Sequence, residues 1–145
     1  MKKILILGTF ILWYGGIFAQ DKKVAVFDPD GKAGKSAKEI IREEVSNVIV
    51  NTRGYAVLER QQIDKVLAEN KFQMSGQVDN AQIVAIGKKI GANAVFVTNA
   101  TELHDELRMP YLYISFKLID VQTGRVEKQK TAKTRGESDI DVVVR

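Results

Sequence analysis

The sequence predicts a single small α/β domain, a mixed β-sheet with helices packed on it that ends in a C-terminal β-hairpin. Three segments in the first two thirds of the chain repeat apolar residues at helical spacing. Short apolar runs separate these segments, and after residue 110 the pattern changes to strict alternation. The expected order is therefore strand, helix, strand, two helices, strand and hairpin, which is typical of a sheet covered by helices.

The first predicted strand covers residues 24–27, an apolar run that ends at a turn containing proline and glycine. Ser36 and Glu39 have the spacing of a capping box, so a helix is expected to begin at Ser36. Apolar residues then follow on one helical face, and Gly54 is expected to stop the helix. Residues 55–58 form the second predicted strand.

Two further helices are expected before the third strand. The first spans residues 61–70, and a loop at residues 73–77 follows it. Asp79 is expected to cap the second, with Gln82 in the answering position. Its buried stripe consists of Ile83, Ile86 and Ile90, and Gly91 ends it. Residues 94–98 form the third strand.

The last third of the chain predicts a hairpin. Residues 111–120 alternate, with Leu112, Ile114, Phe116 and Leu118 on one face and Tyr111, Tyr113, Ser115 and Lys117 on the other. A turn at residues 122–124 leads to a returning strand over residues 125–134. That strand carries Lys128, Lys130 and Lys133, which is typical of an exposed edge strand protected from indiscriminate pairing. Residues 138–145 are expected to begin a last helix.

The N-terminal residues predict export. Lys2 and Lys3 precede an uncharged, mostly apolar run, and Ala19 offers the small residue that a signal peptidase needs. We therefore expect a signal peptide at residues 1–19 and a periplasmic domain at residues 20–145. The alternative, a retained membrane anchor, is disfavoured because the run is short for a spanning helix and contains glycines.

Composition excludes several classes of function. The chain has no cysteine, so it has no disulfide, no thiolate metal site, no cysteine nucleophile and no cysteine for a lipid anchor. Removal of residues 1–19 takes away two lysines, which leaves 20 basic and 18 acidic side chains. That balance does not favour nucleic acid as a partner. No membrane span is expected after removal of the signal.

A near match to a phosphate-binding loop lies at residues 31–36, between a strand and a helix. A P-loop needs a glycine five residues before Gly34, where this chain has Pro29. Proline lacks both the backbone N–H and the conformational freedom of that position. A structural loop is therefore favoured over a nucleotide site, and a weak anion site at the helix start stays open as an alternative.

No catalytic apparatus is evident. His104 is the only histidine, and acidic residues flank it in what reads as a charged connection before Pro110. A metal site would need further ligands, and no serine has the setting of a nucleophile elbow. We expect a solvated loop at His104, no enzyme activity, no cofactor and no metal.

Tyr111 and Tyr113, together with Lys117, are candidates for a recognition surface because tyrosines supply rigid amphipathic contact area. The alternative is that a helix covers this face and buries it. The residues proposed to bind a partner are Tyr111, Tyr113, Lys128, Lys130 and Lys133.

An ordered set of short motifs runs through the middle of the chain: Leu58-Glu59-Arg60, Gln73-x-Ser75-Gly76, Gly87, Gly91-Ala92, Ile119-Asp120 and Gly124. With these motifs, residues 24–126 resemble the CsgG family of curli secretion components and its relatives, the LpoB-type penicillin-binding-protein activators and the N-terminal domain of TolB. The resemblance implies a periplasmic α/β domain that works by protein contact. CsgG itself forms a ring beneath an outer-membrane pore, but this chain lacks a pair of long alternating hairpins for a pore.

Two functions follow as hypotheses. The first is a non-enzymatic adaptor or assembly factor of the cell envelope that binds itself or another envelope protein, with a link to outer-membrane secretion or assembly. The second is a small-ligand or anion-binding protein that uses residues 31–36. A third reading, a truncated relative without an independent role, stays open beside them.

Overall fold

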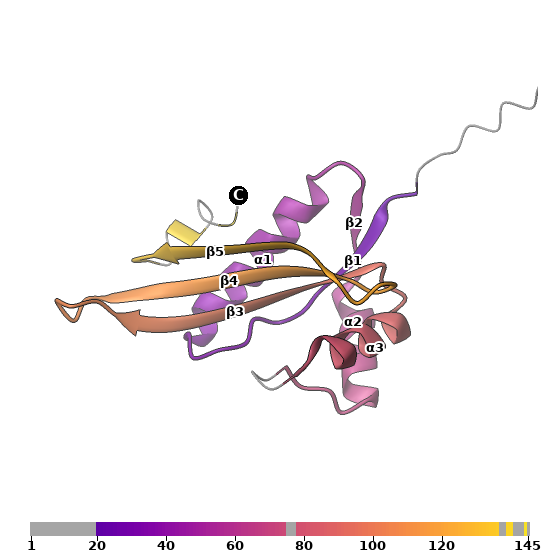
Figure 1. Cartoon of the computed structure of the whole chain (residues 1–145), viewed down its shortest axis with the longest axis horizontal. Helices are drawn as coiled ribbons and strands as arrows, with labels where there is room; N and C mark the ends of the chain where they lie inside the picture. Colours follow the sequence, from indigo (N-terminus) through magenta and orange to yellow (C-terminus); the bar gives the residue numbers. More distant parts are fainter. Residues whose placement is uncertain (1–19, 75–77, 137–138, 141–143, 145) are drawn as a thin grey trace, which may run out of the picture.

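The computed structural model describes residues 20–74, 78–136, 139, 140 and 144. The predicted signal peptide therefore lies outside the described residues, as do most of the last predicted helix and part of the 73–77 loop. The elements follow the predicted order: β1 (Lys22–Val26), α1 (Lys35–Val50), β2 (Tyr55–Val57), α2 (Arg60–Glu69), α3 (Asn80–Ile90), β3 (Ala94–His104), β4 (Pro110–Asp120) and β5 (Val126–Thr134) (Figure 1).

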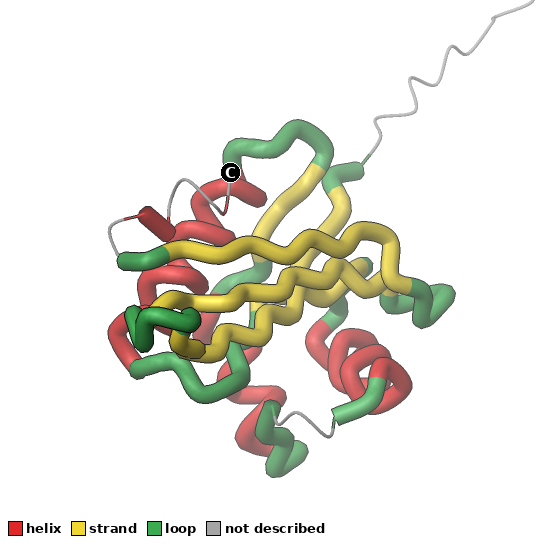
Figure 2. Tube along the Cα trace, turned by 60° about the vertical axis from the view of Figure 1, so that its left-hand side comes forward, coloured by secondary structure: helices red, strands yellow, loops and turns green. Residues whose placement is uncertain are grey.

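The five strands form one mixed sheet in the order β2-β1-β3-β4-β5. β1 pairs in parallel with both β2 and β3, whereas β3, β4 and β5 pair antiparallel as a long meander. Helix α1 covers one face, while α2 and α3 lie on the other face near the β1 end (Figure 2). The predicted fold class, a small α/β domain with a mixed sheet and a C-terminal hairpin, is confirmed.

The core on the α1 side is built by two matching periodicities. Every fourth residue of α1 is buried, at Ala37, Ile41, Val45 and Ile49. The even-numbered residues of β4 face this stripe, and they too are buried: Leu112, Ile114, Phe116 and Leu118. The predicted register of β4 is therefore confirmed.

The core on the other side is held by α3. Asp79 caps this helix as predicted: its side chain accepts a hydrogen bond from the backbone N–H of Gln82, and the Gln82 side chain accepts one from the Asp79 backbone. Gly87 brings the helix close to the sheet, since a Cβ there would lie 2.7 Å from Val121 and 2.8 Å from Val95. The predicted stop at Gly91 is also confirmed, with φ of 80°.

The ends of α1 differ from the prediction. Gly34, and not Ser36, is the N-cap, and Glu39 pairs instead with Lys35 at 3.8 Å. The backbone N–H of Lys38 donates to the Gly34 carbonyl at 3.1 Å, so the first helical hydrogen bond forms earlier than predicted. The helix also ends before Gly54, which has φ of 85° in the turn that enters β2. The side chains of Asn51 and Thr52 donate to the carbonyls of Asn47 and Val48 in the last turn of the helix.

β3 is six residues longer than predicted and runs to His104, which pairs with Pro110. The expected charged connection is therefore the distal part of a long β3–β4 hairpin. The Asp105 carboxylate closes its turn by accepting from the backbone N–H groups of Leu107 and Met109, each at 2.9 Å. The alternation in residues 99–104 was hidden because four of these six residues are polar or charged and only Ala100 and Leu103 are apolar.

The start of β1 is tied to the end of the β4–β5 hairpin by a charged cluster. The Lys22 ammonium lies 3.1 Å from the Asp120 carboxylate and 2.5 Å from that of Glu127. Asp120 also accepts hydrogen bonds from the backbone N–H and the hydroxyl of Thr123. The Thr123 backbone hydrogen bond, with the contributions of Lys22 and the Thr123 hydroxyl, lowers the pKa of Asp120 to about 2 against the opposing effect of burial.

Asp120 is therefore expected to make stability depend on acid pH. Its folded pKa of about 2 lies below the ordinary value of 3.8, so its contribution is complete above that ordinary value and is lost as the pH falls towards 2. We expect Asp120→Asn to lower the free energy of unfolding at pH 7, with the difference from wild type shrinking below pH 4. Urea unfolding of both proteins from pH 7 to pH 2 measures this. A difference that stays constant over the range would contradict it.

Candidate protein-contact surface

Half of one sheet face is left without a helix. We call it the open face; it comprises ten residues of β3, β4 and β5, none of them buried: Asn99, Thr101, Leu103, Tyr111, Tyr113, Ser115, Lys117, Gln129, Thr131 and Lys133. Figure 1 shows why, because α2 and α3 gather at one end of the sheet while the three long strands extend past them. Along β4, Ile119 is fully buried under α2 and α3, whereas Tyr113 on the same face is only half-buried.

The two tyrosines of β4 lie on the open face. Tyr111 and Tyr113 are both half-buried, so a helix does not seal them off. Tyr113 lies between Thr101 of β3 and Lys133 of β5 in the strand register. The Lys133 ammonium lies 5.6 Å from the centre of the Tyr111 ring, a cation–π distance. Aromatic, cationic and polar groups thus meet on one accessible surface.

The three candidate lysines do not share a face. Lys128 and Lys130 pair with Leu118 and Phe116, which places them on the α1 side of the sheet. Lys133 pairs with Tyr113 and belongs to the open face. Side chains alternate between the two faces of a strand, so Lys128 and Lys130, two positions apart, share a face, whereas Lys133, three positions after Lys130, lies on the other.

β5 is an edge strand, as predicted. It pairs with β4 on one side, and no other strand of the described chain lies on its outer side. Five of its nine residues are lysine, glutamate or glutamine, and all five are exposed: Glu127, Lys128, Gln129, Lys130 and Lys133. The outer edge therefore offers backbone hydrogen-bonding groups behind charged side chains.

Exposed apolar residues at the turn of the β3–β4 hairpin extend the open face. Leu107 is 83% exposed and Met109 is 52% exposed. Leu103, which pairs with Tyr111 on the open face, is also exposed. Leu103, Leu107 and Met109 thus place three exposed apolar side chains at one end of the hairpin, which makes this end a candidate contact surface. We call Leu107 and Met109 the hairpin tip.

Backbone groups at the start of the loop at residues 31–36 form hydrogen bonds to β3. The N–H of Asp30 donates to Thr98 and the N–H of Ala33 donates to Ala100, both at 2.9 Å, while Asp30 accepts from the N–H of Ala100 at 2.8 Å. The loop thus continues the sheet beyond the end of β1. Because these N–H groups face β3, they are not available to wrap a phosphate in the manner of a P-loop.

His104 lies at the exposed end of β3. Within the described part of the chain, no group of three or more histidine, cysteine, aspartate or glutamate side chains is close enough to hold a metal ion. Its neighbour Asp105 accepts from the Arg135 guanidinium at 3.1 Å, which ties the base of the hairpin turn to the end of β5.

Residues 21–109 match the family model described as curli production assembly/transport component CsgG. The chain belongs to the CsgG family. The matched residues run from β1 to the turn of the β3–β4 hairpin, so β4 and β5 lie beyond them, although the sequence resemblance extended to residue 126. A comparison with curated protein sequences finds no match.

Solved structures share the fold of this CsgG-family domain over most of its length. The LpoB C-terminal domain from Salmonella enterica has a TM-score of 0.61, with 14% identity over 81% of this chain and 84% of that one. Lipoprotein GNA1162 from Neisseria meningitidis has a TM-score of 0.62, with 14% identity over 81% of this chain and 83% of that one. A PelC dodecamer from Paraburkholderia phytofirmans has a TM-score of 0.54, with 14% identity over 87% of this chain and 84% of that one. TolB from Acinetobacter baumannii, of which 25% is covered, is also similar.

The Leu58-Glu59-Arg60 motif lies within the family match and joins the two helical layers. The Arg60 guanidinium lies 2.6 Å from the Asp28 carboxylate, and the Arg42 guanidinium of α1 lies 3.1 Å from it. Burial tends to raise the pKa of Asp28, but the hydrogen bonds and charges of Arg60 and Arg42 outweigh it, and the pKa is lowered. The motif is thus explained by folding: Asp28, after β1, is bound by one arginine from each side of the sheet.

The sequence left part of the surface undetected. Thr101 and Leu103 were missed because β3 was ended at Thr98, and the hairpin tip was read as a charged connection. The available signal was the run Val97, Asn99, Thr101 and Leu103, which alternates with buried Thr98 and Ala100.

The structural role of the 31–36 loop predicts a contrast between its two glycines. Gly31 has φ of 100°, and a Cβ there would lie 2.3 Å from the carbonyl oxygen of Ala100. Gly31→Ala should therefore cost at least about 1–3 kcal/mol from backbone strain alone. At Gly34 a Cβ would have nothing within 4 Å, so Gly34→Ala should stay within about 1 kcal/mol. Denaturant unfolding measures both; equal costs would show that the loop does not hold β3.

Proposed function

We propose that this protein is a non-enzymatic adaptor or assembly factor of the cell envelope that acts through protein–protein contacts made by the open face, the hairpin tip and the edge of β5. Its partner is a second copy of the chain or another envelope protein. The observation that carries the proposal is the hairpin tip, where Leu107 and Met109 are exposed in the turn that leads into β4, the strand of the two tyrosines.

The chemistry of the surface supports protein contact over catalysis. Tyrosine, exposed aliphatic side chains and a lysine stacked on an aromatic ring are groups that protein interfaces favour. The residues around them are threonine, serine, asparagine and glutamine, which can hydrogen-bond to a partner's backbone. A partner strand added at the edge of β5 would extend the same face by one strand.

Family membership supports the setting in the cell envelope. The family description names curli production, assembly and transport, and one solved structure with this fold is a dodecamer. Export by the signal peptide at residues 1–19 would place residues 20–145 in the periplasm, with attachment to the outer membrane through a partner. No helix in the described part of the chain is long and apolar enough to cross a bilayer.

The first test removes the apolar hairpin tip. We expect Leu107→Ser combined with Met109→Ser to weaken self-association or capture of an envelope partner without lowering stability, because both side chains are already exposed. Val50→Ser is the matched control, since Val50 is 62% exposed at the distant end of α1. Sedimentation velocity of residues 20–145 and affinity capture from envelope extracts, with mass spectrometry, provide the readouts. Unchanged association in the double variant would exclude the tip from the interface.

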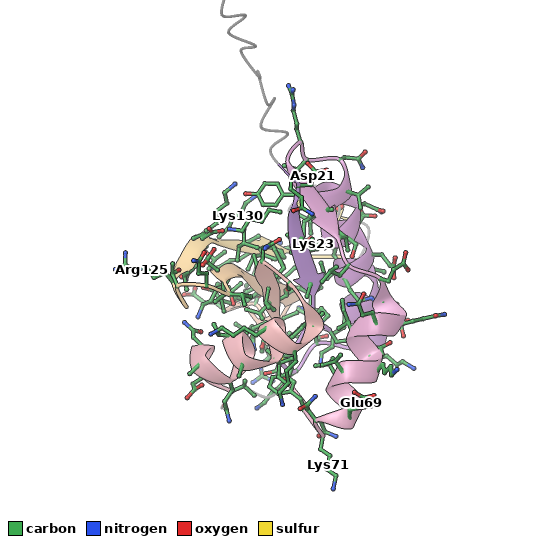
Figure 3. The ribbon with its side chains drawn as sticks, turned by 90° about the vertical axis from the view of Figure 1, so that its right-hand side faces the viewer. Asp21, Lys23, Glu69, Lys71, Arg125 and Lys130 are labelled. Carbon is green, nitrogen blue, oxygen red and sulfur yellow. The ribbon has the colours of Figure 1, made fainter. Side chains whose placement is uncertain are left out.

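The second test concerns charge along β5. Reversal of Lys128, Lys130 and Lys133 to glutamate should weaken association at low salt while the melting temperature stays nearly unchanged. Raising the salt should weaken association of the parent protein, because exposed charges more than about 8 Å apart are screened at physiological ionic strength. The control triple variant reverses the exposed Lys32, Lys65 and Lys71. Figure 3 shows Lys71 at the opposite end of the molecule from Lys130. Equal losses in both variants would show that net charge, and not the edge, matters.

A further inference from the structure

A small polar cavity lies where the first turn of α3 meets the open face. Its volume is about 140 Å³, roughly the space of five water molecules at about 30 Å³ each. α3 borders it through Asn80 and Ile83, and residues of β3 and β4 line the rest together with Asp30. Drug-sized ligands occupy about 300–1,000 Å³, so a ligand that fits this cavity must be much smaller.

Polar side chains of neighbouring segments stand in one row at the cavity. Asp30 forms a parallel bridge with Asn99 of β3, and Asn99 pairs with Ser115 of β4. Residues that pair across a sheet have their side chains on the same face. Lys117, two positions after Ser115, shares that face. The Thr101 hydroxyl donates to the Asn99 amide oxygen at 3.2 Å, which leaves the amide nitrogen of Asn99 to donate to a ligand.

The cavity holds two opposite charges that do not pair with each other. Among the described residues that line it, only Asp30 and Lys117 are ionisable. Neither side chain has an ion-pair partner within 4.0 Å or a hydrogen-bond partner in the part of the chain that the structure describes. Two strand spacings across the sheet and two residues along β4 separate them, which places their α-carbons about 12 Å apart. Both are half-buried, so each charge has lost part of its hydration without gaining a counter-charge.

We propose that this cavity binds a free α-amino acid with a small side chain. The ammonium group of the ligand pairs with the Asp30 carboxylate, and the carboxylate of the ligand accepts from the Lys117 ammonium and the Asn99 amide. An α-amino acid carries both charged groups on one carbon, so a single small molecule supplies each side chain with a charge-assisted hydrogen bond. The volume of the cavity excludes large side chains.

The site borders the protein-contact surface proposed above but does not depend on it. Asn99, Ser115 and Lys117 belong to the open face, whereas Asp30 does not. Neither the hairpin tip nor β5 is among the residues that line the cavity. The measurements below use this protein without a partner, so the failure of either proposal leaves the other standing.

Ligands that lack one charge test the chemistry of the site. We expect the purified protein to bind L-alanine with a Kd below about 1 mM in isothermal calorimetry, which a ligand of this size can reach. Propanoate lacks the ammonium group and ethylamine lacks the carboxylate. Each should bind at least about tenfold more weakly than L-alanine, because each loses one hydrogen bond between charged groups. L-Tryptophan should not bind, because it is too large for the cavity.

Variants then locate the site. Asp30→Asn should lower the affinity for L-alanine at least about tenfold without weakening propanoate, whose charge the Asp30 carboxylate repels. Lys117→Gln should weaken L-alanine and propanoate but not ethylamine. The control combines Asp21→Asn with Lys23→Gln, two exposed charges near the start of β1 that do not line the cavity, and should leave the L-alanine affinity unchanged.

Melting temperatures check that each variant is folded. The proposal is overturned if L-alanine does not bind the parent protein below about 1 mM, or if propanoate and ethylamine bind as tightly as L-alanine. It is also overturned if the control variant loses as much affinity as Asp30→Asn and Lys117→Gln.

Discussion

The architecture depends on how the long strand β3 is kept paired along both edges as far as Ala100. β3 has eleven residues, but its parallel neighbour β1 has only five and pairs with the first few of them. β4 covers the whole of one edge, from Ala94 to His104. On the other edge the loop after β1 takes over, through the exchange of hydrogen bonds between Asp30 and the backbone of Thr98 and Ala100. An unpaired stretch there would leave buried backbone groups without partners.

The same arrangement explains why the two sheet faces differ. α1 runs along most of the meander and buries the even-numbered residues of β4 from Leu112 to Leu118. α2 and α3 are shorter, and their apolar residues reach only the part of the sheet around Val95, Val97 and Ile119. The meander therefore extends past them, and apart from Leu103 the residues of the open face beyond their reach are polar or aromatic. One face became the main core and the other became accessible surface.

Most of the fold could be predicted from the sequence because local and tertiary signals agree in most elements. Asp79, Gln82 and Gly91 satisfy the ends of α3 through their own side chains or conformation, and the structure keeps them there. The start of α1 could not be predicted in this way, because its N-cap is Gly34, which has no capping side chain, and the first helical hydrogen bond runs from Lys38 to that glycine.

The candidate surface was predictable only in part. Tyr111, Tyr113 and the edge position of β5 follow from alternation and composition. The separation of Lys133 from Lys128 and Lys130 follows from the register of β5 on β4, which the count of residues in the strand could have shown. Leu107 could not be recognised, since an isolated leucine in a charged segment carries no periodic signal. Exposure decides its meaning, and exposure is a property of the folded hairpin.

The two ends of the molecule's long axis are structurally unlike. Lys22 anchors the beginning of β1 to Asp120 and Glu127 at one end, and the β3–β4 turn stands at the other. The three-stranded meander separates them, with eleven residues in β3, eleven in β4 and nine in β5. If the domain is held near Lys22, a small rotation of the domain about that point displaces the distant β3–β4 turn much further than the residues near Lys22. Movement at the N-terminal end would thus be amplified at Leu107.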